Sequence, residues 1–420
     1  MDRRLGSTAF ALVVLTSLAC AGARVTTPAP AAGPALRRAL VAADSMVAAA
    51  VGDRMAGAVL LVARDGRVLH ERAYGSAQLH DDARRPLPEP RPMRTSTMFD
   101  LASVTKVMAT TMAVMMLVDR GLVDLDAPVF RYLEDFRGPR RNSITVRHLL
   151  NHSSGLVQWQ PLYYDASTAA GTYAVIRDMP LGWGVGGARH YSDLGFMLLG
   201  YIVERVSGRT LDVFLAEALY RPLGLRQTTF TPKARGFDGF AATELGNGYE
   251  RRMVYDSTFG YRYEGDPRSW DGWRRYVLLG ETNDGNAWYA HGGIAGHAGL
   301  FSTAAELRVL LDLLIGRGAY DGRRYIGAEV VDRFLTPDAY GHHLGWMVPR
   351  GMPAGSFAHN GFTGTYVLGI PAHGLALVLL TNRQHLGTDD RGYFPDLGPL
   401  VQSLSRTILS GAAEDAGIPP

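Results

Sequence analysis

Apolar positions form strand-like runs near both ends of the chain and helix-like spacing in the middle. Near the N-terminus, a helical pattern at 35–50 precedes two apolar runs, 56–63 and 68–73, which Arg64-Asp65-Gly66-Arg67 joins. An Asp-Gly pair between apolar runs is a strong signal for a β-hairpin. Near the C-terminus we expect strands at 344–348, 356–359, 364–370 and 375–381, then a closing helix at 397–409.

Between these ends, apolar residues recur every three or four positions, which predicts amphipathic helices. The expected helices lie at 105–120, 125–135, 144–152, 192–207, 210–219, 304–315 and 328–335. Gly121 and Gly208 follow two of them, at a position where glycine commonly ends a helix. Residues 76–97 are polar and rich in proline, which indicates a loop, and 231–290 have no regular period.

These elements together predict an α+β fold. The simplest arrangement is one antiparallel sheet built from both termini and flanked by the terminal helices, beside a large, mostly helical inserted domain. Residues 35–98 and 340–412 would form the sheet part of a single domain, 99–339 its helical part, and 413–420 a tail. A cleft between two such parts is a favoured position for a binding site.

The first 24 residues have the pattern of an export signal, because two arginines precede a short apolar segment that ends in small residues. Residues 25–34 are rich in proline and alanine, which suits an extended tether. Cys20 closes the signal, and there it resembles the lipidated cysteine of a bacterial lipoprotein. Ser17 departs from that pattern, since leucine is usual at its place, so plain secretion with cleavage just beyond Cys20 stays open. We expect an exported protein of the periplasm or cell envelope.

Composition narrows the possible functions. The formal net charge is +3 without a long basic run, so nothing points to nucleic acid as a partner. Cys20 is the only cysteine, which excludes a disulfide framework. Contact with a membrane is expected only through a lipid on Cys20.

Lysine is rare in this chain, and that makes one of the two lysines conspicuous. Lys+Arg is 43, but only Lys106 and Lys233 are lysines. Lys106 stands three residues after Ser103, and an apolar helical run follows. If Ser103 opens that helix, both side chains lie on one face. A serine hydroxyl needs a neighbouring base to act as a nucleophile. Lysine, unlike arginine, serves as that base if its pKa is lowered, or it organises a proton relay by its charge.

From these two residues alone, another interpretation is equally good. Ser103 is then an N-cap of the helix, and Lys106 is a solvated residue of the first turn. Two further stretches decide between them: Tyr191 lies just before a predicted helix, and His359-Asn360-Gly361 lies between two predicted strands.

Together with Ser103-x-x-Lys106, these stretches resemble the serine β-lactamase and penicillin-binding superfamily. The resemblance is closest to the branch of class C β-lactamases, esterases and D-aminopeptidases. Further blocks fit the family in the same order, so the resemblance covers most of the chain after the signal; they are 121–126, 144–156, 191–208, 222–225 and 296–303.

The resemblance implies a role for each matching residue. Ser103 attacks a carbonyl and becomes acylated, while Lys106 and Tyr191 together remove the serine proton and later activate water. The oxyanion hole consists of the backbone N–H groups of Ser103 and Phe362. Gly361 lets the strand backbone approach the substrate closely. A tyrosine beside cationic groups is expected to have a lowered pKa.

Two substrate-binding positions depart from the family pattern. Asp193 stands where the family has asparagine, and an ionised carboxylate cannot donate to a substrate carbonyl. It can instead pair with Lys106, His190 or Arg189. His359 stands where β-lactamases have a lysine that binds the substrate carboxylate, and histidine is only partly charged near neutral pH.

With Asn360 and Gly361 as further substrate-binding positions, we expect weak selection for carboxylate-bearing substrates. The sequence therefore predicts an exported serine hydrolase that acts on esters or amides through an acyl-serine. One alternative is a β-lactamase, a D-Ala-D-Ala-type carboxypeptidase or a D-aminopeptidase. Another is a non-catalytic relative that binds peptidoglycan fragments or a protein partner.

Small molecules are the expected partners, and no cofactor or metal is expected. His148 and His152 stand four residues apart, like metal ligands on a helix, but no glutamate lies between them. A packed histidine pair is the preferred interpretation. His291 and His297, in a glycine-rich stretch, are expected to be structural residues at the rim of the cleft.

Overall fold

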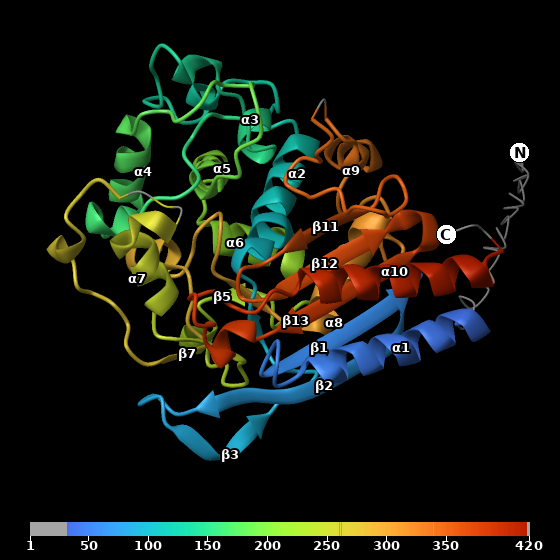
Figure 1. Cartoon of the computed structure of the whole chain (residues 1–420). Coiled ribbons are helices and arrows are strands. Elements are labelled where there is room, and N and C mark those ends of the chain that lie inside the picture. The colour runs from blue at the N-terminus through green and yellow to red at the C-terminus, as the bar shows by residue number, and fades with distance from the viewer. Residues whose placement is uncertain (1–31, 260, 262, 339, 418–420) are drawn as a thin grey trace, which may run out of the picture.

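A six-stranded antiparallel sheet joins the two ends of the chain (Figure 1). The computed structural model describes residues 32–259, 261, 263–338 and 340–417. The strand order is β11-β12-β13-β1-β2-β3. The strands are β1 (Gly57–Arg64), β2 (Arg67–His80), β3 (Pro86–Pro92), β11 (Phe357–Asn360), β12 (Thr365–Ile370) and β13 (Leu375–Thr381). The pairing of β1 with β13 connects the N-terminal hairpin to the C-terminal strands, so the predicted α+β fold is confirmed.

Helices cover both faces of this sheet. The terminal helices α1 (Pro34–Ala50) and α10 (Gly398–Asp415) lie together on one face, and α8 (Ala304–Ile315) packs on the other (Figure 1). Alternate residues of β1 therefore enter different cores: Leu60 packs with the terminal helices, and Leu61 with the main core. A strand buried on both faces is a continuous apolar run, which is what β1 shows. Residues 304–315 were expected in the helical part, but α8 packs against β13, β12 and β1 of the sheet.

The last helix also holds the first one in place. The carboxylate of Asp415 accepts hydrogen bonds from the backbone N–H groups of Ala35 (2.9 Å) and Leu36 (3.0 Å). These are free donors at the start of α1, where a negative charge is favourable. The predicted boundary of a tail at 413 is therefore wrong, because the helix continues to the residue that caps α1.

The rest of the molecule is mostly helical. Its helices are α2 (Met112–Asp119), α3 (Val146–Leu150), α4 (Ala169–Asp178), α5 (Asp193–Ser207), α6 (Leu211–Leu215), α7 (Gly248–Tyr255) and α9 (Ala328–Leu335). Four short strand pairings accompany them, formed by β4 (Phe99–Asp100), β5 (Thr229–Phe230), β6 (Ala242–Leu245), β7 (Val277–Leu279), β8 (Leu300–Ser302), β9 (Ala319–Tyr320) and β10 (Arg323–Arg324). The run Ala102–Asp119 is apolar and long enough to cross a membrane, but 83% of it is buried inside the fold as a core helix.

Several predicted elements differ from the structure. Residues 125–135 contain only a 3₁₀ turn at Val129–Arg131, and 344–348 contribute a single bridge from Met347 to Ala358. The expected loop at 76–97 contains the end of β2 and all of β3. β3 is an edge strand, where prolines are tolerated because half of the backbone donors are unpaired. Within 231–290 the structure forms α7, β6 and β7.

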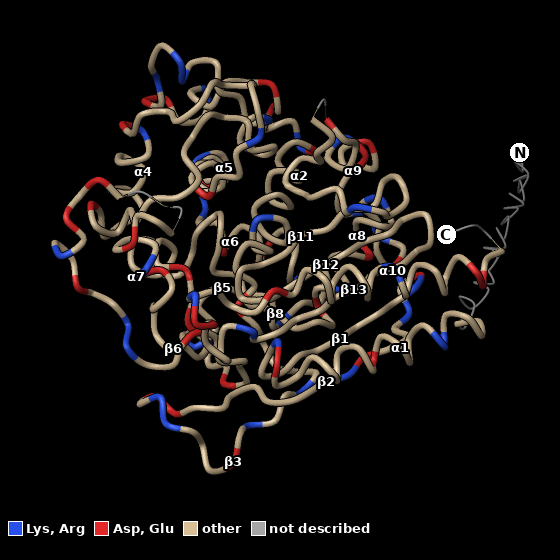
Figure 2. Tube along the Cα trace, in the orientation of Figure 1, with Lys and Arg blue, Asp and Glu red and all other residues tan. Residues whose placement is uncertain are grey.

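Charged residues are dispersed along the trace without a long run of either sign (Figure 2). The predicted export signal, Cys20 and residues 25–31 of the predicted tether lie outside the described residues.

Candidate active site

Ser103 lies where a small sheet meets the buried helical run. β4, β8 and β5 pair in that sheet, and the backbone N–H of Leu101 donates to the Leu300 carbonyl at 3.0 Å. The Leu300 N–H in turn donates to the Thr105 hydroxyl at 3.1 Å. Ser103 is thereby fixed in a 3₁₀ turn (Ala102–Val104), from which the helical run continues through a π-helical stretch (Lys106–Thr111) into α2. π-Helical turns are frequent at functional sites.

The residue before Ser103 has a strained backbone. Ala102 has φ of 45°, in the left-handed region that residues with a side chain rarely adopt. Asp100 stabilises this conformation, since one of its carboxylate oxygens accepts from the Ala102 N–H at 2.9 Å and the other from the Asn283 N–H at 2.6 Å. Burial raises the pKa of Asp100 to about 6. Strain of this kind persists where the surroundings enforce it, commonly at active sites.

Lys106 is completely buried, and its ammonium group has three oxygen partners. The Nζ atom donates to Ser103 Oγ at 2.9 Å and to the His297 carbonyl at 3.0 Å, and it lies 2.7 Å from Asp193 Oδ1. Burial alone would lower the pKa of Lys106, but Asp193 and Tyr191 outweigh it and raise that pKa above its ordinary value. Of the two roles open to this lysine, the structure favours a fixed charge over a base with a lowered pKa. Asp193 takes Lys106 as its partner among the three that the sequence left open.

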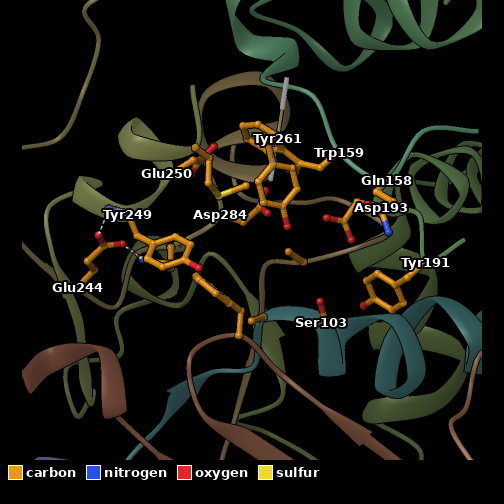
Figure 3. Close-up of a pocket in the computed structure, with 15 residues that line it drawn as sticks. Ser103, Gln158, Trp159, Tyr191, Asp193, Glu244, Tyr249, Glu250, Tyr261 and Asp284 are labelled. Carbon is orange, nitrogen blue, oxygen red and sulfur yellow. Dashed lines mark hydrogen bonds between the residues drawn. The ribbon is translucent and has the colours of Figure 1, made fainter. Parts of the chain in front are cut away.

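Tyr191 is held between two cations, and its hydroxyl points towards Ser103 (Figure 3). The ring centre lies 5.0 Å from Lys106 Nζ and 5.7 Å from the Arg189 guanidinium carbon. The expected lowering of its pKa is nevertheless wrong. Burial raises the pKa of Tyr191 by more than Lys106 lowers it, and the Asp193 carboxylate raises it further. Tyr191 is therefore a neutral phenol near pH 7.

The ring of His152 packs against the ring of Tyr191, a role that the sequence did not indicate. Its ring lies 4.4 Å from the Tyr191 ring, and its Nδ1 accepts from the Ser192 N–H at 3.0 Å. His148 instead accepts from the Thr145 N–H at 3.2 Å and caps α3. The two histidines therefore do not form the packed pair that we expected. No group of three or more residues suited to hold a metal occurs within the described ranges.

The turn from β11 into β12 is hydrogen-bonded to the segment before Ser103. The Thr363 hydroxyl donates to the Asp100 carbonyl at 2.7 Å, and the Thr365 hydroxyl to the Leu101 carbonyl at 3.0 Å. A Cβ atom on Gly361 would lie 2.3 Å from that Leu101 carbonyl. Glycine at this position therefore permits a close approach within the protein, rather than to a substrate as predicted. These two hydrogen bonds and the close approach at Gly361 bring Phe362 to the wall of the cavity that Ser103 also lines.

His359 and Asn360 are not part of the cavity wall. His359 is buried, and its Nδ1 lies 2.8 Å from the Asn360 carbonyl, which requires a donor, so Nδ1 carries the hydrogen. Burial and the nearby charge of Lys106 lower the pKa of His359 to about 3, so the imidazole is neutral. Asn360 is exposed.

A cavity of about 230 Å³ opens above Ser103 (Figure 3). Tyr191, Asp193 and Phe362, all predicted from the sequence, line it. The sequence analysis missed its other walls, which are carboxylates, carboxamides and aromatic rings from distant segments; they include Gln158, Trp159, Glu244, Tyr249, Glu250, Tyr261, Asn283 and Asp284.

A carboxylate and a histidine support the far side of Lys106. Asp284 Oδ1 lies 2.9 Å from His297 Nε2, and the His297 carbonyl is one of the three Lys106 partners. The charge of His297 and its hydrogen bond hold the pKa of Asp284 below its ordinary value despite burial. His297 was expected at the cleft rim, and its position behind Lys106 gives it a structural role there.

Comparison with known proteins agrees with this arrangement. The β-lactamase family model matches residues 43–396, so the chain belongs to this family of serine hydrolases. The chain is 33% identical over 371 residues to an N-acetylmuramyl-L-alanine amidase of Bacillus subtilis strain 168, covering 81% of this chain and 80% of the relative. It is 32% identical over 368 residues to an Escherichia coli K12 protein named by inference as a D-alanyl-D-alanine carboxypeptidase, covering 80% and 81%.

Solved structures show the same fold. A penicillin-binding protein homologue from Caulobacter crescentus superposes with a TM-score of 0.65 at 21% identity, covering 91% of this chain and 99% of the other. EstCE1, described as a hydrolase with promiscuous acyltransferase activity, gives 0.65 at 21% identity, covering 90% and 100%.

The role of Asp193 can be measured directly, because the chain has only two lysines. In protein labelled with ¹³C at lysine Cε, Lys106 and Lys233 give two NMR signals, and a Lys233→Arg variant assigns them. We expect Asp193→Asn to lower the pKa of Lys106 by at least one unit, since burial then acts without the carboxylate that opposes it.

The matched control is Asp126→Asn, which removes an exposed carboxylate that pairs with Arg147 and should leave the Lys106 signal unchanged. A wild-type Lys106 that titrates below pH 10, or an Asp193→Asn variant with the wild-type value, would contradict the assigned role.

Proposed function

We propose that this member of the β-lactamase family is an exported serine hydrolase that cleaves amides and esters through an acyl intermediate on Ser103. One observation carries the proposal: Ser103 Oγ lies 2.9 Å from a buried lysine, with the Tyr191 hydroxyl beside it, at the floor of a cavity. A non-catalytic binding protein has no need of a buried cation at this hydroxyl, because such a cation costs several kcal/mol unless it is paired.

The raised pKa of Tyr191 suggests how the proton moves. A phenol that is already protonated cannot remove the serine proton by itself. It can accept that proton while it passes its own to the leaving amine or alcohol. Ser103 Oγ then bonds to the carbonyl carbon and the bond to the leaving group breaks. Water then takes the place of the leaving group, and its oxygen bonds to the acyl carbon while it gives one proton to Tyr191. Tyr191 passes its own proton to Ser103 Oγ, the bond between Ser103 Oγ and the acyl carbon breaks, and the acid leaves. The charge of Lys106 stabilises both transfers.

The backbone N–H groups of Ser103 and Phe362 are the proposed oxyanion donors. Both residues line the cavity, and the hydrogen bonds of Thr363 and Thr365, at the turn into β12, hold their segments together. Donors fixed before the reaction stabilise the developing negative charge without reorganisation.

Charge at the site favours substrates without a carboxylate beside the scissile bond. His359 is neutral, and the Asp193 carboxylate balances the charge of Lys106, so neither position leaves a cation free to bind a substrate carboxylate. The similarity to an N-acetylmuramyl-L-alanine amidase supports an amide bond in a peptidoglycan fragment as the target. A D-Ala-D-Ala carboxypeptidase, the runner-up, must bind a terminal carboxylate, and the cavity wall offers no lysine or arginine among the described residues.

Export and lipidation of Cys20 are part of the proposal, and the pattern of residues 1–24 supports them.

Covalent labelling tests the nucleophile. We expect a fluorophosphonate to add one adduct to the wild-type protein, seen by intact-mass spectrometry and mapped to the peptide that contains Ser103. Ser103→Ala should abolish both the adduct and hydrolysis of p-nitrophenyl acetate. Ser45→Ala, at an exposed serine of α1, serves as the control and should label normally. Labelling and turnover that persist in Ser103→Ala would sink the mechanism.

A matched peptide pair tests the charge preference. We expect the wild-type enzyme to cleave acetyl-D-alanyl-D-alanine no faster than its C-terminal carboxamide, with kcat/KM values within about threefold. His359→Lys, checked by its melting curve, should raise the carboxylate preference at least tenfold because it adds a cation. A wild-type preference above tenfold for the carboxylate contradicts the proposal, whether or not the variant folds.

Export is tested by expressing the full chain in a bacterial host. We expect the mature protein in the membrane fraction, with a diacylglyceryl group on Cys20 by mass spectrometry, and a soluble exported protein from Cys20→Ser. A mature N-terminus beyond Cys20 without lipid would show plain secretion. Cytoplasmic protein with residues 1–24 intact would contradict export itself.

A further inference from the structure

The cavity above Ser103 has two aromatic walls that the chemistry does not use. The rings of Trp159 and Tyr261, which lie together in Figure 3, meet edge to face with their centres 5.3 Å apart. The rings of Tyr249 and Phe362 form the second wall and meet edge to face with their centres 5.0 Å apart. Phe362 keeps 38% of its surface exposed. Aromatic faces left open in a cavity are favourable contacts for an apolar ligand surface.

Polar side chains also line the cavity, and most of its carboxyl groups are paired or have a raised pKa. Asp193 is neutralised by Lys106, and Asp284 is paired with His297. Burial raises the pKa of Glu244 to about 7 and also raises that of Glu250, so neither is a strong anion near neutral pH. These carboxyl groups are suited to hydrogen bonds with hydroxyl groups more than to an ion pair.

We propose that this cavity is a subsite for one pyranose ring of the substrate. A pyranose has apolar C–H faces, which suit the aromatic walls, and a rim of hydroxyls, which suits Gln158, Glu244 and Asp284. The cavity volume of about 230 Å³ is below the roughly 300–1,000 Å³ of typical small-molecule pockets, which favours one ring over an extended chain.

The inference rests on the proposed function and extends it to the substrate. In a muramyl amide the sugar belongs to the acyl group, so the ring stays with Ser103 after the amine leaves. The structure thus assigns the sugar-bearing acyl group to the aromatic cavity. Tyr261 and Gln158 become specificity-determining residues.

Two amides with the same scissile bond, both without a carboxylate beside it, test the subsite: N-acetylmuramyl-L-alaninamide and D-lactoyl-L-alaninamide, which lacks the sugar. We expect the wild-type kcat/KM to be at least tenfold higher for the sugar-bearing amide. Tyr261→Leu should reduce that ratio at least fivefold, and Gln158→Ala should also reduce it if Tyr261→Leu folds poorly. Tyr255→Leu, at an exposed tyrosine of α7 outside the cavity wall, should keep the ratio.

Binding to the Ser103→Ala protein gives a readout that needs no catalysis. By calorimetry, N-acetylmuramic acid should bind at least tenfold more tightly than D-lactate, and Tyr261→Leu in the same background should remove the difference. If the wild-type enzyme cleaves both amides equally, the subsite proposal is overturned while the hydrolase stands. The same holds if putrescine, a dication without a ring, binds better than the sugar, because the cavity then favours an ion pair. If the sugar binds but neither amide nor ester is cleaved, the subsite stands and the proposed function fails.

Discussion

The buried ammonium group of Lys106 is the constraint on which the site depends. A charge with no access to water must be met by several oxygen atoms, or it costs several kcal/mol. Here the partners come from three places: Ser103 in the same turn, Asp193 at the start of α5, and the His297 carbonyl. Satisfying one cation therefore fixes the relative positions of Ser103, the helix that follows Tyr191 and the segment that carries Asp284 and His297.

Asp193 and His359, the two departures from the family pattern, both fit the buried positive charge of Lys106. Asp193 neutralises Lys106, which an asparagine in its place could not do. A lysine at 359 would add a cation near Lys106 and Arg189, both of which already act against protonation of His359. The neutral imidazole avoids that repulsion. The residues that stabilise the buried lysine thus also remove the fixed positive charge that a carboxylate-bearing substrate requires.

Sequence patterns predicted the sheet and the pairing of Ser103 with Lys106 well, because both depend on local signals. The hairpin at Asp65-Gly66, the apolar strand at 375–381 and Ser103-x-x-Lys106 are each visible within a few residues. Asp100, His152 and Trp159 could not be found this way, since only long-range folding brings them to the site. The direction of the Tyr191 pKa was also mispredicted, because the sequence showed the nearby cations but not the extent of burial that outweighs them.

The residues that local sequence signals reveal are those proposed for the chemistry, and the residues that only folding brings together are those proposed for specificity. Ser103, Lys106 and Tyr191 lie at the ends of buried elements, where packing fixes them. Tyr249, Glu250 and Tyr261 come from 231–290, a segment whose sequence has no regular period and whose aromatic rings pack mainly on one another. Segments of this kind tolerate change better than core elements do. A change in this segment can therefore alter the cavity without disturbing Ser103, Lys106 and Tyr191, and in this chain the aromatic segment bounds the space that the proposed mechanism assigns to the acyl group.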